Sequence, residues 1–100
     1  MRYEIKFAES IEDDLKNVKA FYTQQIFDQI RKQLKYEPDK ETKHRKKLEG
    51  LVPPWTAVEP IWQLTVEPYR VFYDVDTPNH IVWVRAVRYK PHGKRTEEIL

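Results

Sequence analysis

The sequence contains no cysteine, only two glycines and one methionine, and no long hydrophobic run. Without cysteine, neither disulfides nor cysteine-bound metal can stabilise the fold, which fits a cytoplasmic protein. No apolar stretch approaches the roughly 20 residues that span a bilayer. The opening MRYEIKF lacks the apolar region of a secretory signal. We therefore expect a soluble, cytoplasmic protein that makes no membrane contact.

Several catalytic motifs are absent as well. The chain has no glycine-rich phosphate loop, no HExxH pattern and no Ser-His-Asp arrangement that spacing would reveal. Its three histidines, His44, His80 and His92, are scattered along the sequence. We therefore expect no metal site and no cofactor.

The charged residues are distributed unevenly around a net charge of +2. Lys and Arg dominate residues 43–50 and 85–100, whereas Asp and Glu dominate residues 51–84, where Arg70 is the only cation. Segregated charge of this kind favours a polyanionic partner such as a nucleic acid. A run such as KHRKK is, however, more often simply a solvated loop.

The apolar spacing in the first half of the chain predicts a strand followed by helix. Alternating apolar residues within residues 2–7 are typical of a half-buried strand. Residues 9–36 contain no glycine or proline and place apolar residues at helical spacing, with Ser10 available as an N-cap. The spacing alone leaves open whether this region is one long helix or two.

The second half predicts strands. After a proline-rich connection over residues 37–60, period-two spacing predicts three strands in an antiparallel meander, at residues 62–67, 69–76 and 81–89. The chain is thus predicted to be α+β, with residues 1–100 forming one domain.

The last strand begins apolar and ends basic. Period-two spacing predicts that Val82, Val84 and Ala86 share a face with Arg88 and Lys90. This pattern indicates a core face that opens into a charged cleft.

Arg70 is an unusual residue for the start of an apolar strand. If its strand pairs antiparallel with the last one, Arg70 lies beside Arg88 and Lys90 and joins a basic cluster. The alternative is an ion pair with Asp74 or Glu67 at the rim of the sheet. The pattern by itself leaves both interpretations open.

The string PYRVFYDVD followed by IVWVRAVRYK resembles the RelE/ParE superfamily, the toxins of bacterial type II toxin–antitoxin pairs. The resemblance extends over nearly the whole chain, through a helical region that ends in YEP, a basic KHRKKLEG segment and the string WQLTVEPYRVFYDV. It implies a helical hairpin within residues 9–36, packed on one face of a four-stranded sheet. It also implies a cognate antitoxin as partner.

The resemblance leaves the target of the toxin open. RelE-type members cut messenger RNA in the ribosomal decoding site and so inhibit translation, whereas ParE-type members act on DNA gyrase. The phosphate-stabilising strand arginine of RelE corresponds to Arg70, and a later active-site arginine falls approximately at Lys90. Two lysines on the preceding strand of RelE correspond to Gln63 and Thr65 here, a departure that favours a gyrase inhibitor or an inactive relative that only binds its antitoxin.

YoeB-like relatives end the last strand with Arg-Tyr-His-Tyr, which Arg88 and Tyr89 match, while Lys90 replaces the histidine and His92 follows two residues later. The predicted catalytic residues of an endoribonuclease are Arg70, Arg88, Tyr89, Lys90 and His92. The planar guanidinium of Arg70 suits phosphate oxygens, and His92 is the only nearby side chain of the type that most often transfers protons near neutral pH.

The basic segment supplies a second predicted set, for binding the RNA backbone: Lys43, Arg45, Lys46 and Lys47. Trp55 and Trp83 are predicted as exposed anchors for the antitoxin. The alternative is that both tryptophans belong to the core.

Overall fold

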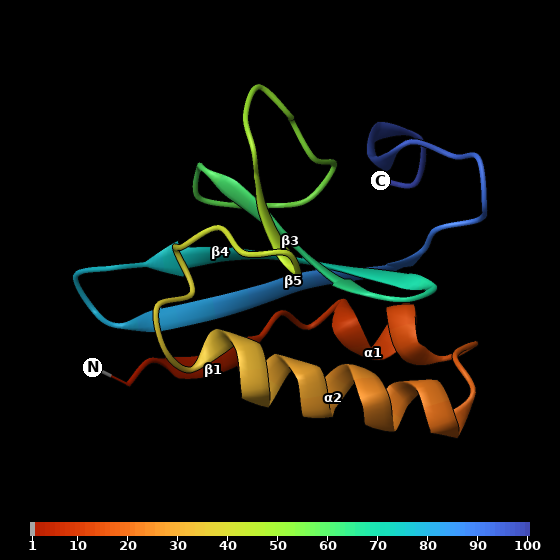
Figure 1. The fold of residues 1–100 in the computed structure, drawn as a ribbon, viewed down its shortest axis with the longest axis horizontal. Coiled ribbons are helices and arrows are strands. Elements are labelled where there is room, and N and C mark those ends of the chain that lie inside the picture. Colours follow the sequence, from red (N-terminus) through yellow and green to blue (C-terminus); the bar gives the residue numbers. More distant parts are fainter. Residues whose placement is uncertain (1) are drawn as a thin grey trace.

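The computed structural model describes residues 2–100 as a five-stranded sheet with two helices on one face (Figure 1). The elements are β1 (Glu4–Phe7), α1 (Ile11–Leu15), α2 (Ala20–Leu34), β2 (Arg45–Leu48), β3 (Ile61–Val66), β4 (Tyr69–Asp76), β5 (Ile81–Tyr89) and a 3-10 turn, η1 (Thr96–Glu98). The strand order is β1-β5-β4-β3-β2; β1 runs parallel to β5, and the other neighbours are antiparallel. Within the described residues, no helix has the length and apolar character needed to cross a membrane.

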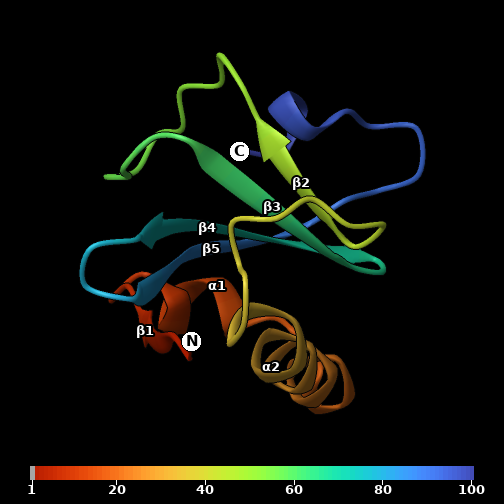
Figure 2. The same cartoon turned by 60° about the vertical axis from the view of Figure 1, so that its left-hand side comes forward.

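The helical region forms two helices, as the resemblance implied. Ile26, Ile30 and Leu34 lie on one side of α2 and are almost completely buried against the sheet. The side view in Figure 2 shows both helices on the same side of the strands. The predicted α+β fold and its β3–β4–β5 meander are therefore confirmed.

The predicted number of strands is wrong by one, because the basic segment forms the short edge strand β2. Arg45 explains its position: the buried guanidinium donates from Nη1 to the carbonyl oxygens of Gln33 (2.9 Å) and Glu37 (2.7 Å). These carbonyls lie at the end of α2, where the helix leaves its own carbonyls without partners. Charged residues dominate the segment, so its sequence lacks the alternation that identifies a strand.

α1 and the residue before it supply hydrogen-bond partners to the part of β5 that β1 leaves unpaired. β1 pairs only with the first half of that strand, from Ile81 to Val84. Beyond it, the Ser10 hydroxyl donates to the Arg85 carbonyl (3.3 Å), and the Val87 N–H donates to the Asp14 carboxylate (2.9 Å). Ser10 occupies the N-cap position of α1, as predicted, but its hydroxyl makes no capping hydrogen bond to the helix. Edge groups of a sheet need partners, and here α1 supplies them.

A β-bulge in β5 changes the predicted faces. Phe72 pairs with Ala86 and Tyr73 with Val84, so Arg85 is an extra residue opposite the β4 strand. One extra residue moves every later side chain to the other face. Val84 therefore packs in the helix-side core, whereas Ala86 packs on the opposite face. The prediction that both share a face is wrong.

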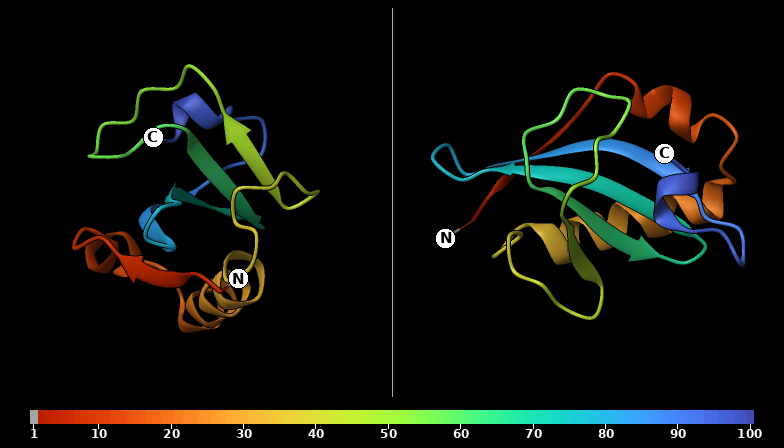
Figure 3. Two further views of the ribbon diagram at one scale, coloured as in Figure 1. Left: turned by 90° about the vertical axis from the view of Figure 1, so that its left-hand side faces the viewer. Right: turned by 90° about the horizontal axis from the view of Figure 1, so that it is seen from above.

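The face opposite the helices has a small apolar cluster of its own. Ile61, Phe72 and Ala86 are buried there. They are covered by residues from the 49–60 loop and the C-terminal segment, namely Trp55, Ala57, Ile99 and Leu100. Figure 3 shows this loop and the C-terminal turn lying over the strands.

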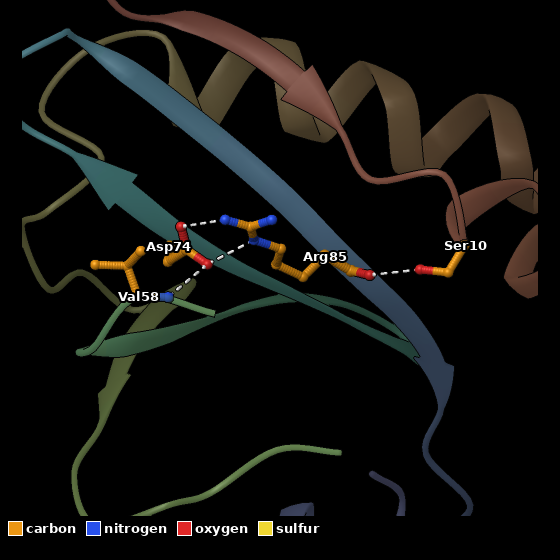
Figure 4. A network of polar contacts seen from close by, with 4 residues as sticks. All are labelled: Ser10, Val58, Asp74 and Arg85. Carbon is orange, nitrogen blue, oxygen red and sulfur yellow. Dashed lines mark hydrogen bonds and ion pairs between the residues drawn. The ribbon is translucent and has the colours of Figure 1, made fainter. Parts of the chain in front are cut away.

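A polar network fastens the 49–60 loop at the bulge (Figure 4). The buried Asp74 carboxylate accepts hydrogen bonds from Arg85 Nε (2.7 Å) and Nη2 (3.3 Å) and from the Val58 N–H (3.3 Å). The bulge residue thus supplies the charge that Asp74 needs, since a buried carboxylate requires a partner.

Trp55 and Trp83 are half-buried, which lies between the exposed anchor and the core position that were the two predicted alternatives. Trp55 packs on Phe72, with ring centroids 5.5 Å apart. Trp83 lies under the guanidinium of Arg85 (4.9 Å) and near the ammonium of Lys6 (5.8 Å). Neither ring stands free as the exposed anchor that was expected.

Candidate active site

Arg70 lies in β4 directly opposite Arg88 of β5, as the antiparallel pairing predicted. Its side chain is 10% exposed, and Nη2 contacts the Glu67 carboxylate at 3.0 Å. Nη1 donates to the Tyr69 carbonyl (3.0 Å). Of the two proposed ion-pair partners, Arg70 therefore uses Glu67, while Asp74 binds Arg85.

Four of the five predicted catalytic residues line one open cavity of about 480 Å³ beside the end of β5. They are Arg70, Tyr89, Lys90 and His92. Glu67 and Lys94, which the sequence analysis missed, complete its charged lining. The basic composition of residues 85–100 was the available signal for Lys94, and the Glu67 alternative for Arg70 was the signal for the carboxylate.

Three local backbone features shape the segment after β5 that lines this cavity. Lys90 N–H donates to the Pro68 carbonyl (2.9 Å), which holds the end of β5 against the β3–β4 turn. Pro91 lacks the N–H that a further strand residue would need. Gly93 then takes a positive φ of 88°, which favours glycine, and turns the chain back. His92 and Lys94 are thus brought beside Arg70.

Arg88 is not among the residues that line the cavity. Its Nη1 forms an ion pair with Asp14 of α1 at 2.8 Å, and its guanidinium lies 5.2 Å from the Trp55 ring centre. Arg88 therefore links α1 to the loop on the other face. Arg88 is paired with Arg70 across the two strands, as predicted, but its guanidinium binds Asp14 and does not line the cavity.

Gln63 and Thr65, at the positions of the two RelE lysines, have different neighbours in the fold. Gln63 is buried, and its Oε1 accepts a hydrogen bond from the Thr96 hydroxyl of η1 (2.9 Å). Thr65 pairs with Arg70 across β3 and β4. The C-terminal turn therefore covers the sheet next to Arg70, where the family lysines would stand.

The four predicted RNA-binding residues lie in three different environments. Lys43 and Lys46 are exposed, and neither forms an ion pair with any of residues 2–100. Lys47 is half-buried and pairs with Glu49 at 3.4 Å. Arg45 is only 7% exposed and caps α2, which removes it from the predicted set.

Arg45→Ala should therefore change the stability of the fold, whereas Lys46→Ala should change only the binding of RNA. Arg45→Ala removes a buried side chain and the donor to the Gln33 and Glu37 carbonyls, so we expect the free energy of unfolding to fall by about 1–3 kcal/mol. Lys46→Ala should leave stability unchanged and reduce the salt slope of RNA binding by about one. Urea denaturation and RNA titrations at several salt concentrations measure these quantities; equal stability of the two variants would contradict the assignment.

No group of three His, Asp or Glu side chains within residues 2–100 is arranged to hold a metal ion. The side chains that line the cavity offer one guanidinium, two ammonium groups, one imidazole, one phenol and the Glu67 carboxylate. A guanidinium and two ammonium groups can bind a phosphodiester, and an imidazole can transfer protons.

The family model described as the ParE toxin of the type II toxin–antitoxin system parDE matches residues 5–91. The chain belongs to this family of toxins. The resemblance to the RelE/ParE superfamily is thereby confirmed. The match begins within β1, includes both α-helices and strands β2 to β5, and ends at Pro91, before η1.

The fold of the toxin is similar to two solved toxin–antitoxin structures. A chain of the archaeal RelE–RelB complex from Pyrococcus horikoshii OT3 aligns with a TM-score of 0.69 and 24% identity, covering 95% of the toxin and 100% of that chain. A chain of the RelBE2 complex from Mycobacterium tuberculosis aligns with a TM-score of 0.68 and 17% identity, covering 90% and 100%. No curated protein matches the sequence of the toxin.

Proposed function

We propose that the toxin is an endoribonuclease that cleaves messenger RNA on the ribosome and so stops translation. The observation that supports this function is the shared cavity of Arg70, Lys90 and His92. Cleavage of an RNA strand without a metal requires a phosphate-binding group, a base for the ribose 2′-OH and an acid for the leaving oxygen. These residues supply the required chemical types.

The reaction begins when neutral His92 accepts the proton of the 2′-OH. The 2′-oxygen then forms a bond to phosphorus, and the bond from phosphorus to the 5′-oxygen breaks. Lys90 or Tyr89 donates a proton to this leaving oxygen, so the products are a 2′,3′-cyclic phosphate and a 5′-hydroxyl. Arg70 binds the phosphate oxygens through its planar fork while their negative charge increases.

Glu67 must release Arg70 when the phosphate binds. The Glu67 side chain is 71% exposed, so it can rotate into solvent, whereas the Arg70 side chain is only 10% exposed and needs a new partner when Glu67 leaves. A phosphodiester then replaces the carboxylate as the partner of Arg70. Lys43 and Lys46, which are exposed beside and on the edge strand β2, bind further phosphates of the RNA backbone.

The test of this function is cleavage of messenger RNA by the purified toxin on translating ribosomes. The expected result is new RNA ends that map to the ribosomal decoding site and bear 2′,3′-cyclic phosphates. Intact messenger RNA at toxin concentrations that arrest growth in cells would overturn the proposal.

Gyrase inhibition is the second candidate function. The ParE family match and the neutral Gln63 and Thr65 at the positions of the RelE lysines favour it. A supercoiling assay with purified gyrase, run beside the ribosome assay, separates the two candidates. Loss of supercoiling with intact messenger RNA would favour gyrase as the target.

We also propose that a cognate antitoxin occupies the groove between β1 and α2. Both similar structures are toxin–antitoxin complexes. An open cavity of about 490 Å³ in this groove is lined by Tyr3, Ile5, Phe7, Phe27 and Ile30 together with basic Arg2, Arg31 and Lys35. β1 is an edge strand with one unpaired side. A peptide segment with apolar and acidic residues can extend this edge and bury the aromatic rings.

Phe7→Glu should weaken antitoxin binding by at least about 10-fold, because aromatic anchors dominate interface energies. Phe7 is 41% exposed and contacts Phe27 with ring centroids 5.5 Å apart. Isothermal titration of the antitoxin encoded beside the toxin measures this change. Val52→Glu, at an 83% exposed loop position, is the matched control and should bind as the wild type does. Equal affinities of the two variants would exclude the groove.

A further inference from the structure

A row of four aromatic side chains leads from the cavity to the first turn of α2. Tyr89 lines the cavity. Its ring centroid is 5.7 Å from that of Tyr69, which is 5.5 Å from Tyr22, which in turn is 5.5 Å from Phe21. Neighbouring rings are inclined by 58–65°, so each ring packs its edge or tilted face on the next. We call these four residues the aromatic row.

The two ends of the aromatic row are exposed, whereas Tyr22 and Tyr69 between them are half-buried. Phe21 is 67% exposed and Tyr89 is 56% exposed, whereas Phe72 and Tyr73 of the core are fully buried. Packing of the core therefore does not account for the two ends of the row. The ring contacts hold the side chains in place, so a ligand would find their faces already ordered.

The row has a polar as well as an apolar character. None of the hydroxyl groups of Tyr22, Tyr69 and Tyr89 has a hydrogen-bond partner among residues 2–100, in contrast to Tyr73, which donates to the Pro38 carbonyl at 2.7 Å. Burial raises the pKa of Tyr69, and the neighbouring Tyr22 and Tyr89 raise it further. The Tyr69 hydroxyl therefore stays neutral and can donate a hydrogen bond at physiological pH.

We propose that the aromatic row stacks the bases of single-stranded RNA whose scissile phosphate binds at Arg70. This inference rests on the proposed nuclease function and extends its binding site onto α2. Bases have apolar faces and polar edges, and tyrosine rings match both properties. Lys90 and Lys94 at the cavity end of the row provide the positive charge that a polyanion requires. Stacking accepts every base, so the row positions RNA with little sequence preference.

The test measures binding of a fluorescently labelled single-stranded RNA that is 2′-O-methylated and cannot be cleaved. Tyr22→Ala and Phe21→Ala should each lower its affinity by about 10-fold, while Tyr22→Phe, which keeps the stacking ring and loses only the hydroxyl, should bind more tightly than Tyr22→Ala. The slope of log affinity against log salt should not change in either alanine variant, whereas Lys94→Ala should reduce it by about one. Phe21 is 67% exposed, so Phe21→Ala should leave the fold intact, and a loss of RNA affinity in this variant cannot be attributed to unfolding.

An abasic oligonucleotide of the same length is the matched ligand control, because it keeps the charge and removes the bases. Wild type and Tyr22→Ala should bind it equally. If the toxin cleaves RNA but both alanine variants bind the labelled RNA as tightly as wild type, the aromatic row is not a stacking surface and the nuclease function stands. If the variants keep RNA affinity and lose antitoxin or gyrase binding, the row is a protein interface and the inference is wrong. If wild-type toxin neither binds nor cleaves RNA, both proposals fail.

Discussion

Replacing Arg70 with alanine should slow cleavage of messenger RNA on translating ribosomes by about 10²–10³-fold, because it removes a charged donor from the phosphate in the transition state. Arg70→Lys should restore only part of this loss, since one ammonium cannot reproduce the bidentate fork of the guanidinium. The free energy of unfolding should fall as well, because the largely buried Arg70 side chain loses its packing and its contacts with Glu67 and the Tyr69 carbonyl, so cleavage is compared for the folded fraction of each variant. Single-turnover cleavage and urea denaturation measure the two effects.

Glu67→Gln is the matched control for Arg70→Ala. It removes the same ion pair and leaves the guanidinium in the cavity. If Arg70 acts on the phosphate, Glu67→Gln should cleave at least as fast as the wild type while Arg70→Ala is slow. Equal cleavage by Arg70→Ala and wild type would show that Arg70 is a structural ion-pair partner, even though the chain is a toxin of this family.

Asp74→Ala should lower the free energy of unfolding by about 3–5 kcal/mol, because it leaves Arg85 as a poorly solvated charge beside the bulge. Asp74 is 1% exposed, and its carboxylate also holds the Val58 N–H of the 49–60 loop (Figure 4). The loop should therefore become accessible to proteases as well. Urea denaturation and limited proteolysis measure the two consequences.

Arg85→Ala and the double variant complete a thermodynamic cycle for this network. Arg85→Ala leaves the buried Asp74 carboxylate without its cation, so we expect a loss of similar size. The double variant should lose less than the sum of the two single variants, since neither charge is then left alone. Losses below about 1 kcal/mol in both single variants would contradict a stabilising role for the pair. Neither residue is among those that line the cavity, so cleavage by the folded fraction should persist.

Local spacing predicted most of the fold. β4 and β5 begin and end at the predicted residues 69–76 and 81–89, because alternating apolar side chains with turn residues between them leave few other arrangements. The pairing of Arg70 with Arg88 follows from the same meander. The family resemblance then identified the hairpin, which spacing alone could not divide into α1 and α2.

The sequence by itself determined that a basic and aromatic group of residues would gather at the end of the last two strands. Only the tertiary structure decided which side chains meet there. Arg88 is turned to Asp14 and Arg45 to the end of α2, because buried carbonyls and carboxylates far away in the sequence need donors. The bulge at Arg85 lets this residue pair with Asp74, and it moves the later side chains of β5 to the opposite face of the sheet. Such partners depend on distances across the folded chain, and no local spacing encodes them.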